Sequence, residues 1–419
     1  MKQFIFFICS LCFVPTLFAQ STDTLFLDDC YNNAIKNYPL YEQKELHKLA
    51  SELRMKNYTT NYLPTLDFNA QATYQSDVPG IDLPLANISK VSKDQYKASI
   101  DLKQVIYDGG LTNSHKKIEK ADFDVRENRI DVELYKLKER LNKIYFYVLL
   151  LKENEKLLNT EIHEINERKK NVESSVKNGV LLDSNVDVLE AALLKTNQQL
   201  IDVIAGEKAA FLMLQDYIKQ PISEKSVFVL PTIDINLCDS IKRPENRLFD
   251  NEITKLDLTS KLISKKRNPK LFGFGQFGYG RPGLNMLSND FDTYYIFGAK
   301  LSWNILDWKN SSRQKDELSI YKNIVNTQKR TFEKNIRIVL DKEKCEIEKF
   351  EKLIESDEKI IKLRTKILKR SASKLENGVI TSTDYLVDLN AETQSKIDLK
   401  THKIRLVQSK INYLTISGN

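Results

Sequence analysis

Residues 65–74 have the sequence TLDFNAQATY, in which polar and apolar side chains alternate. Because successive side chains of a strand point to opposite faces, this segment predicts a strand with one apolar face. The alternation recurs in 96–106 and 295–305, and a weaker Gly/Phe-rich version lies near 270–280. The apolar positions are Leu66, Phe68, Ala70, Ala72 and Tyr74, then Tyr96, Ala98, Ile100, Leu102 and Ile106, then Tyr295, Phe297, Ala299, Leu301, Trp303 and Ile305.

Strands of about ten residues with one apolar and one polar face are typical of outer-membrane β-barrels. A small soluble sheet with one face on a core gives the same alternation. The barrel is favoured here because the chain offers no amphipathic helix sized to cover such a sheet. Four strands cannot enclose water, and an open edge cannot lie in lipid, so several chains must contribute strands. Three chains would give about twelve strands, wide enough for a pore.

The segments between the strand pairs carry heptad repeats. Over 130–176 apolar residues alternate at spacings of four and three, and over 340–375 they recur more loosely at sevens, as in a coiled-coil seam. Long helices are expected over 110–178 and 309–377, each about 100 Å long, so we expect an elongated molecule. The seam residues are Ile130, Leu134, Leu137, Leu141, Ile144, Val148, Leu151, Leu158, Ile162, Ile165, Val172 and Val176, then Leu340, Ile347, Ile354, Ile361, Leu368 and Leu375.

The chain is internally duplicated. Asn-Gly-Val at 178–180 recurs at 377–379. Each half has the order helix, two strands, long helix, turn and return helix. We predict a first structural repeat over 20–219, a linker over 220–244 and a second repeat over 245–419.

The N-terminus predicts export. A basic start at Lys2, an apolar run over 4–18 and a small residue, Ala19, are typical of a secretory signal peptide, here 1–19. A retained membrane anchor is the alternative, but the run is short for a spanning helix. Cys9 and Cys12 lie inside the apolar run, which is the wrong context for lipid attachment.

Composition excludes several classes of protein. The chain has 419 residues, and its 19 Phe and 18 Tyr exclude a disordered protein. Its net charge of +7 arises from 64 Lys+Arg and 57 Asp+Glu, a mixed surface that does not imply nucleic acid. The mature chain keeps Cys30, Cys238 and Cys345, which are too far apart to signal a disulfide framework or a zinc site.

No combination of residues indicates catalysis. GFGQFG at 273–278 matches a dinucleotide fingerprint, but YGRPG at 279–283 cannot open the helix that the fingerprint requires. The histidines are isolated from one another, and no nucleophile has a base at a suitable spacing. We therefore predict a non-enzyme with no catalytic residues, no metal and no cofactor. The histidines are His47, His115, His163 and His402.

Two turns, KNGVLLDS (177–184) and ENGVITST (376–383), end the long helices. In each, Gly suits the residue after the helix, and Ser, Thr or Asp can cap the return helix. Both turns are expected to expose an apolar pair at the tip of the rod, Val180-Leu181 and Val379-Ile380. Exposed apolar residues at such a place predict a docking site.

Together these features resemble TolC-like outer-membrane efflux proteins, and the resemblance covers essentially the whole mature chain. The family's tip motif is roughly Gly-Leu-x-x-x-x-Asp-Val-Leu-x-Ala. The second turn matches it with Gly378-Val379-Ile380 followed by Asp384-Tyr385-Leu386. The first turn has Gly179-Val180-Leu181, with Asn185 at the Asp position and Asp187-Val188-Leu189 two residues late.

The resemblance implies an α+β membrane protein: a homotrimeric outer-membrane β-barrel, with four strands per chain, continued by a long periplasmic coiled-coil barrel. It implies that the tips (Gly179, Val180, Leu181, Gly378, Val379 and Ile380) dock a periplasmic adaptor, or membrane fusion, protein. The adaptor would link the channel to an inner-membrane pump. The implied periplasmic gate consists of acidic and polar tip residues. These are Asp384, Asp388, Asn185 and Asp187.

We therefore predict the passive outer-membrane exit duct of a tripartite efflux pump or type I secretion system in a Gram-negative bacterium. The barrel would contact outer-membrane lipid, and most of the chain would lie in the periplasm. One alternative is a periplasmic coiled-coil scaffold without a pore, whose strands form a soluble sheet. A stand-alone trimeric porin is disfavoured, because a porin has no use for long periplasmic helices.

Overall fold

The computed structural model describes residues 24–78, 91–235 and 240–419. The signal peptide predicted over 1–19, with Cys9 and Cys12, and Cys238 lie outside these ranges. The chain divides into two compact units. Unit 1 comprises Met1–Asn37, Glu139–Ile235 and Glu346–Ile411, and unit 2 comprises Tyr38–Lys138, Asn236–Cys345 and Asn412–Asn419.

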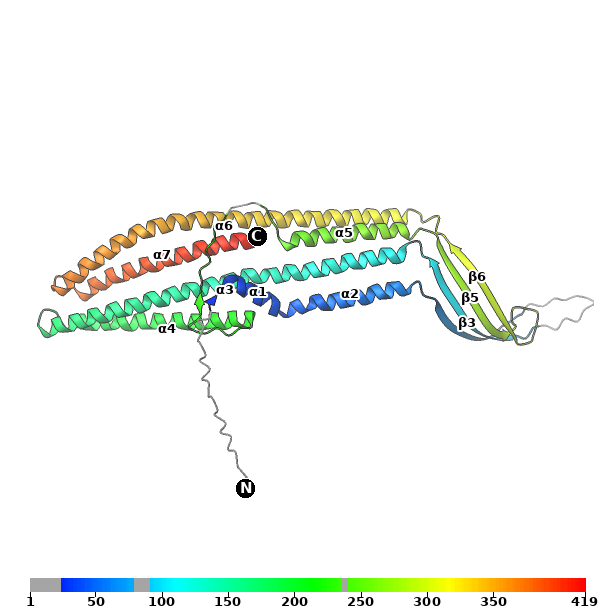
Figure 1. The fold of residues 1–419 in the computed structure, drawn as a ribbon, viewed down its shortest axis with the longest axis horizontal. Coiled ribbons are helices and arrows are strands. Elements are labelled where there is room, and N and C mark those ends of the chain that lie inside the picture. Colours follow the sequence, from blue (N-terminus) through cyan, green and yellow to red (C-terminus); the bar gives the residue numbers. More distant parts are fainter. Residues whose placement is uncertain (1–23, 79–90, 236–239) are drawn as a thin grey trace, which may run out of the picture. The chain divides into compact units, whose positions relative to one another are not determined.

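Unit 2 contains a four-stranded antiparallel sheet with the order β2-β3-β5-β6 (Figure 1). Each strand contains one of the alternating segments of the sequence. The strands are β2 (Thr65–Tyr74), β3 (Asp94–Tyr107), β5 (Lys270–Arg281) and β6 (Asp292–Ser302). The strand pairs of the two halves of the sequence therefore join along β3 and β5 into one sheet.

β6 is shorter at its C-terminal end than the sequence pattern predicts. The alternation continues to Ile305, but the strand ends at Ser302. Ser302 pairs with Lys270, the first residue of β5, so the residues that follow have no partner strand. Trp303 and Ile305 consequently lie beyond the sheet, where both are exposed.

An aspartate caps the long helix of each half. The Asp108 carboxylate accepts hydrogen bonds from the backbone N–H groups of Gly110 (2.8 Å) and Thr112 (2.6 Å) and from the Tyr62 hydroxyl (2.7 Å). Asp307, at the equivalent position of the second half, accepts one from the backbone N–H of Ser311 (3.1 Å). A carboxylate at this point satisfies helix amides that have no partner within the helix.

Helices make up most of the structure. The long helices α3 and α6 have 67 residues each and contribute to both units. Among the described residues, no helix is both long enough and apolar enough to span a membrane. The helices are α1 (Leu27–Asn37), the short 3₁₀ helix η1 (Pro39–Tyr41), α2 (Glu42–Thr60), α3 (Leu111–Lys177), α4 (Ser184–Ile218), α5 (Pro244–Lys265), α6 (Asn310–Glu376) and α7 (Ser382–Ser417).

The heptad positions form the packed side of the long helices. In α3, Leu137, Leu141 and Ile165 are almost completely buried. In α6, Leu340 and Leu375 are buried as well. Burial at this spacing explains why the segments form long helices, because the apolar stripe is matched by neighbouring helices.

The core of unit 1 is built around Tyr145 of α3. Its hydroxyl lies 2.8 Å from the carbonyl oxygen of Leu25 and 2.7 Å from that of Val229. These residues belong to or follow a short parallel sheet of β1 (Thr24–Leu25) and β4 (Val227–Phe228). The thiol of Cys30 lies in the same core, and burial, with a smaller contribution from Asp29, raises its pKa to about 12. This cysteine is therefore inert at neutral pH.

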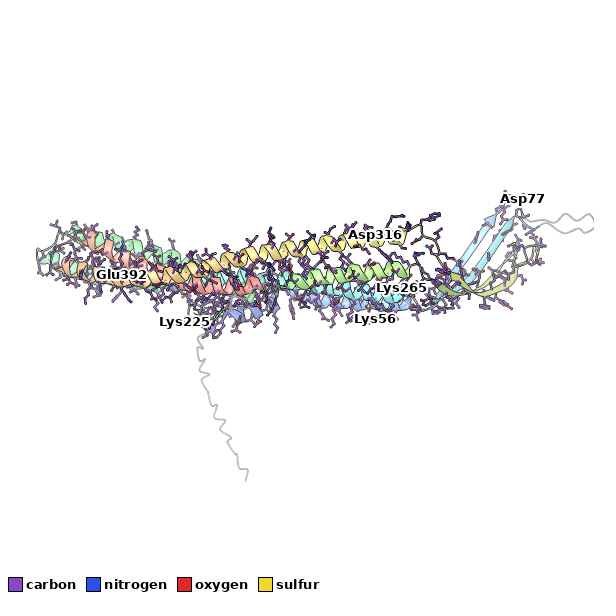
Figure 2. All side chains as sticks on the ribbon, turned by 90° about the horizontal axis from the view of Figure 1, so that it is seen from above. Lys56, Asp77, Lys225, Lys265, Asp316 and Glu392 are labelled. Atoms are coloured by element: carbon purple, nitrogen blue, oxygen red, sulfur yellow. The ribbon has the colours of Figure 1, made fainter. Side chains whose placement is uncertain are left out.

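Several charged side chains pair across neighbouring helices. Within unit 1, Lys400 pairs with Glu153 at 3.1 Å. Glu392 on α7, labelled in Figure 2, is almost fully buried. Its carboxylate pairs with Lys396 (2.8 Å) and accepts a hydrogen bond from the Thr365 hydroxyl (2.9 Å). The charge of Glu392 is thus buried together with its partners.

Candidate functional site

One face of the unit 2 sheet is apolar and exposed. A row across all four strands pairs Phe68 with Ile100, Ile100 with Phe277, and Phe277 with Tyr295. Their exposed fractions lie between 44% and 73%. No described residue of the chain covers this row. Other exposed apolar residues of the same face are Leu66, Tyr74, Tyr96, Leu102, Tyr279, Phe297 and Leu301.

The opposite face of the sheet is polar over β2 and β3 and mixed over β5 and β6, where Phe274 and Ile296 are also exposed. The Asp101 carboxylate accepts hydrogen bonds from the side-chain amides of Asn69 (2.6 Å) and Gln276 (2.6 Å), which connects β2, β3 and β5. On the same face, Lys103 pairs with Asp67 at 3.0 Å. The sheet thus presents apolar side chains to one side and, over β2, β3 and the middle of β5, a hydrogen-bonded polar layer to the other.

Aromatic side chains gather at both ends of the sheet. At the end near Tyr74, the Arg281 guanidinium lies over the rings of Tyr96 (5.4 Å) and Phe291 (5.2 Å). Arg281 also pairs with Asp94. At the other end, Tyr107 and Trp303 are exposed. Aromatic residues at both ends of an apolar band are typical of strands that cross an outer membrane.

Both outer strands of the sheet leave an edge open. β2 pairs only with β3, and β6 pairs only with β5, within the part of the chain that the structure describes. Each of these edge strands presents a row of unpaired N–H and C=O groups. Since the sheet has an even number of antiparallel strands, β6 of one copy can pair antiparallel with β2 of another.

The GFGQFG segment lies within β5, and its glycines make room for aromatic rings. The Phe297 ring covers Gly275, and the Tyr294 ring covers Gly278, where an added Cβ would lie 2.4 Å from a ring atom. On β6, Gly298 is covered in the same way by the ring of Phe274. Packing of rings over glycines explains this motif without a bound dinucleotide.

The two tip turns form at the same end of unit 1 and have the same hydrogen-bonding pattern (Figure 1). The N–H of Gly179 bonds to the carbonyl of Val176 (2.9 Å), and the N–H of Val180 bonds to that of Ser175 (2.9 Å). Equivalent bonds form at Gly378. Both glycines have positive φ, +74° and +67°. These are the bonds of a Schellman motif, which favours glycine at this point.

The expected exposure of the apolar pairs is wrong for one member of each pair. Val180 (55%) and Val379 (69%) are exposed, but Leu181 and Ile380 are half-buried. Both half-buried side chains pack against a buried cluster at the tip. Leu182, which the sequence pattern did not single out, is exposed instead. The cluster consists of Ile165, Val172, Leu189, Leu375, Tyr385, Leu386 and Leu389.

The polar tip residues have distinct roles in the structure. Asn185 Oδ1 accepts a hydrogen bond from the backbone N–H of Ser382 (2.9 Å), so the first turn caps the return helix of the second. The exposed Asp384 caps its own turn, with Oδ2 accepting from the Thr381 N–H (3.0 Å). The Thr381 hydroxyl oxygen in turn accepts a hydrogen bond from the backbone N–H of Asp384 (3.2 Å), which completes a capping box.

The remaining two gate candidates differ in their surroundings. Asp388 is half-buried and accepts a hydrogen bond from the hydroxyl of Ser371 on α6. Asp187 is exposed on the first turn of α4. The structure therefore brings Asn185 close to the second turn, whereas Asp388 is occupied by a contact between α6 and α7.

A further contact at the tips was not predicted from the sequence. Arg168 of α3 pairs with Glu376 of α6 at 2.6 Å, and its guanidinium lies 5.0 Å from the ring centre of Tyr385. Burial raises the pKa of Tyr385, although Arg168 acts in the opposite direction. These residues are far apart in sequence, and only the register between the two helical hairpins brings them together.

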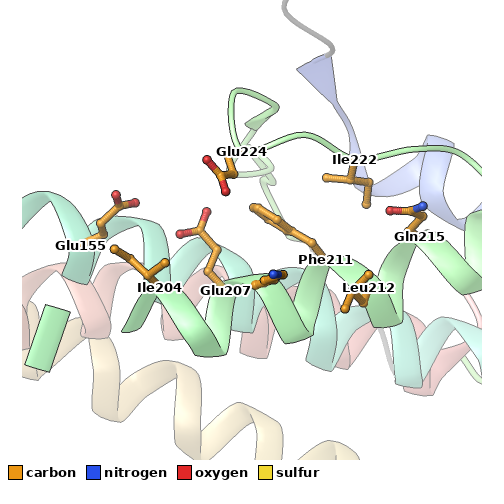
Figure 3. A pocket seen from close by; sticks show the side chains of 9 residues that line it. Glu155, Ile204, Glu207, Phe211, Leu212, Gln215, Ile222 and Glu224 are labelled. Carbon is orange, nitrogen blue, oxygen red and sulfur yellow. The ribbon is translucent and has the colours of Figure 1, made fainter. Parts of the chain in front are cut away.

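A separate cavity of about 320 Å³ lies beside α4 in unit 1 (Figure 3). Glu155, Glu207 and Glu224 lie at one end, and Phe211 contributes to its apolar part (Figure 3). Burial raises the pKa of Glu207. Its carboxylate pairs with Lys152 at 3.0 Å, so its buried charge has a counter-ion within the chain.

The structure resembles those of several outer-membrane proteins. The outer membrane protein VceC from Vibrio cholerae superposes with a TM-score of 0.69 and 11% identity, covering 94% of this chain and 96% of that one. The Campylobacter jejuni CmeC outer membrane channel superposes with a TM-score of 0.65 and 14% identity, covering 94% of this chain and 85% of that one. The Neisseria gonorrhoeae MtrE outer membrane channel, in its open state, superposes with a TM-score of 0.67 and 14% identity, covering 94% of this chain and 89% of that one.

No family model matches the sequence, and no curated protein matches it either. Because the sequence identities are only 11% to 14%, these three structural similarities show a shared fold and nothing more specific. The chain has the α+β fold of these outer-membrane proteins over nearly its whole length. The resemblance to TolC-like proteins that the sequence predicts is confirmed at this level.

Proposed function

We propose that three copies of this chain form a passive exit duct through the outer membrane of a Gram-negative bacterium. The observation that carries the proposal is the unit 2 sheet, which has one exposed apolar face, a polar layer on the opposite face around Asp101, and two open edges. Lipid is the environment in which such an apolar face is stable. The open edges are tolerated there only when other strands pair with them.

Three copies suit the geometry best. Two copies would give about eight strands, whose interior side chains fill, whereas three give about twelve and leave room for water. The polar layer around Asp101 would then line the channel. The helices also expose apolar residues that a neighbouring copy can cover. Examples are Leu46, Leu49 and Leu53 on α2, Ile320 and Ile324 on α6, and Leu194 and Ile201 on α4.

The tip turns are the proposed docking site for a periplasmic adaptor protein, which in turn contacts an inner-membrane pump. Val180 and Val379 supply exposed apolar contacts, and Leu182 adds a third. The duct itself would perform no bond chemistry, and the pump would supply the energy. Gly179 and Gly378 would fix the conformation in which these side chains are presented.

We place the periplasmic gate at the same tips. Asp384 and Asp187 are exposed and would supply the negative charge of the entrance. Asn185 and Asp388 are engaged between helices and would hold the tip together. A ring of carboxylates in a narrow entrance attracts cations and repels anions.

The assembly and the pore can be tested together. The protein should fractionate with the outer membrane, and in mild detergent its mass should be near three chains. The same particles should conduct ions in a planar bilayer. A mature protein that is soluble without detergent would instead support the periplasmic scaffold, and a monomer that conducts would contradict the shared barrel.

A further inference from the structure

A second cavity in unit 1, of about 310 Å³, lies among α3, α4 and α7. Amide and hydroxyl groups dominate its polar lining. Three helices contribute to it, Asn154 and Glu161 from α3, Gln199 from α4, and Asn390, Thr393 and Gln394 from α7. Its volume lies at the lower end of the range of about 300–1,000 Å³ that small-molecule sites occupy.

Glu161 is the notable member of this lining. Its exposed fraction is only 7%, and it lies between the buried residues Leu158 and Ile165 of the α3 seam. No hydrogen bond or ion pair connects its carboxylate to any residue that the structure describes. Burial raises its pKa, and the nearby Glu164 raises it further.

Other buried glutamates of unit 1 have partners. Glu207 pairs with Lys152 near the cavity of Figure 3, and Glu392 pairs with Lys396 and Thr365. The Glu161 side chain is mostly buried, but its carboxylate oxygens are not fully enclosed, and the residue lines the cavity. A mostly buried carboxylate without a donor is stabilised when a cation reaches it. Glu161 lines a cavity large enough to admit such a cation.

The lining favours an ammonium group over a metal ion. Within the described ranges, no group of three His, Cys, Asp or Glu side chains could hold a metal. The Gln394 amide donates to Asp398 (2.8 Å), which leaves its oxygen free to accept a hydrogen bond. Lys195 of α4 also lines the cavity and acts against a bound cation. The Glu161 carboxylate and the amide and hydroxyl oxygens of the lining nevertheless supply acceptors for the three N–H donors of an alkylammonium.

We propose that this cavity binds a small primary amine, whose ammonium pairs with the Glu161 carboxylate and donates to the amide side chains of α4 and α7. The bound amine would connect three helices of unit 1 that otherwise meet around a cavity. It would therefore stabilise the folded protein in proportion to its occupancy. The site is distinct from the proposed docking residues and from the gate.

The test uses the full-length protein in mild detergent at constant ionic strength, with putrescine as the probe. Calorimetric titration should show saturable binding, and the melting temperature should rise with it. Glu161→Gln should weaken binding about ten-fold or more, because it removes the charged acceptor. Glu164→Gln removes a charge from the same helix outside the lining and should leave binding within about two-fold. The uncharged 1,4-butanediol, of equal length, should not bind.

Acid should weaken binding, because a protonated Glu161 cannot pair with an ammonium. Lys195 on α4 is the other charged residue of the lining, and Glu164 on α3 is close enough to raise the pKa of Glu161. Without probe, Glu161→Gln should melt no lower than the unmodified protein, since it removes a mostly buried charge that has no ion-pair partner. The proposal is overturned if putrescine shows no saturable binding, or if the Glu161→Gln protein binds it as tightly as the unmodified protein does. It is also overturned if Glu164→Gln weakens binding as much as Glu161→Gln does, or if Glu161→Gln alone lowers the melting temperature.

Discussion

Asn185 and Asp384 occupy equivalent positions in the two halves of the sequence, yet their side chains act on different turns. Asn185 caps α7 across the hairpins, whereas Asp384 caps its own turn. Asn185→Ala should therefore loosen the contact between the two turns by about 1 kcal/mol, the usual cost of losing a helix cap. Faster hydrogen exchange of the Ser382 amide would report this.

The matched control is Asn185→Asp, which keeps an acceptor oxygen at the same place and adds a charge that suits a helix N-terminus. Exchange at Ser382 should then stay close to that of the unmodified protein. If the alanine and aspartate variants exchange equally fast, the cap across the hairpins does not operate in solution.

The Asp108 carboxyl is a single residue that makes the stability of the fold depend on pH. Burial favours its neutral form, but hydrogen bonds from Thr112, Tyr62 and Gly110 outweigh burial and lower its pKa from 3.8 to about 2. A lowered carboxylate pKa stabilises the fold above pH 3.8, and that contribution fades as pH falls towards 2. Asp108→Asn should cost about 1–2 kcal/mol at neutral pH and progressively less between pH 4 and pH 2.

Thermal unfolding of both proteins across that pH range measures the difference. Asp307→Asn is a useful comparison, since hydrogen bonds from Ser311 also lower the pKa of the Asp307 carboxyl. A cost of Asp108→Asn that does not change with pH would show that shape, rather than charge, explains the cap.

At the scale of the element, the two tip turns differ in how much space surrounds their glycines. An added Cβ at Gly179 has no neighbour within 4 Å, whereas one at Gly378 lies 3.3 Å from Val180 Cγ1. Both positions have positive φ, so either alanine substitution costs about 1 kcal/mol or more in backbone strain. Gly378→Ala should cost more, because Val180 must also move.

Hydrogen exchange of the turn amides in Gly179→Ala and Gly378→Ala gives the comparison. Adding Val180→Ala to Gly378→Ala should recover part of the loss by removing the close neighbour. Equal costs in the two single variants, or no recovery in the double variant, would mean that the turns do not contact each other as described.

The sequence predicts elements well where a pattern is long and local. The alternation in 65–74 and the heptads of 130–176 identify a strand and a helix because each residue's face is set by its neighbours along the chain. The end of β6 could not be found in this way. Trp303 and Ile305 continue the alternation, but β5 provides no partner beyond Lys270.

The tip shows the same limit for the candidate site. Glycine turns were predictable, since only a few residue types adopt positive φ. The burial of Leu181 and Ile380, and the pairing of Arg168 with Glu376, depend on how one hairpin packs against the other. No local spacing encodes that register, so these contacts could not be predicted from the sequence.

At the scale of the whole molecule, the assembled tips should control ion selectivity. Asp384→Asn keeps an acceptor for the Thr381 N–H, so it removes charge while leaving the capping box in place. Three carboxylates around one axis should favour cations, and the variant should therefore lower cation preference in single-channel recordings under a salt gradient. Asp216→Asn, on the last turn of α4, removes an equal charge elsewhere and should leave the reversal potential unchanged.

An unchanged reversal potential in Asp384→Asn would leave this residue with only its capping role. The result would still be compatible with a trimeric duct, because the barrel strands belong to unit 2 and the substitution lies in unit 1. Adding Asp187→Asn tests whether the second exposed acid compensates for the first.

The last prediction separates the two proposed surfaces of the chain. Gly179→Trp with Gly378→Trp should abolish export, since indole rings would displace the apolar tip that contacts the adaptor. Trimer mass and membrane insertion should persist, because the strands lie in the other unit. Phe68→Lys with Phe277→Lys should do the reverse, as a lysine facing lipid costs about 2–4 kcal/mol at the membrane centre.

Export is measured in cells that depend on the substituted gene, with the Gly179→Ala, Gly378→Ala protein as the control for turn strain without bulk. Normal export by the tryptophan variant would show that the adaptor binds elsewhere, while loss of its trimer would show that the tips also hold the assembly together.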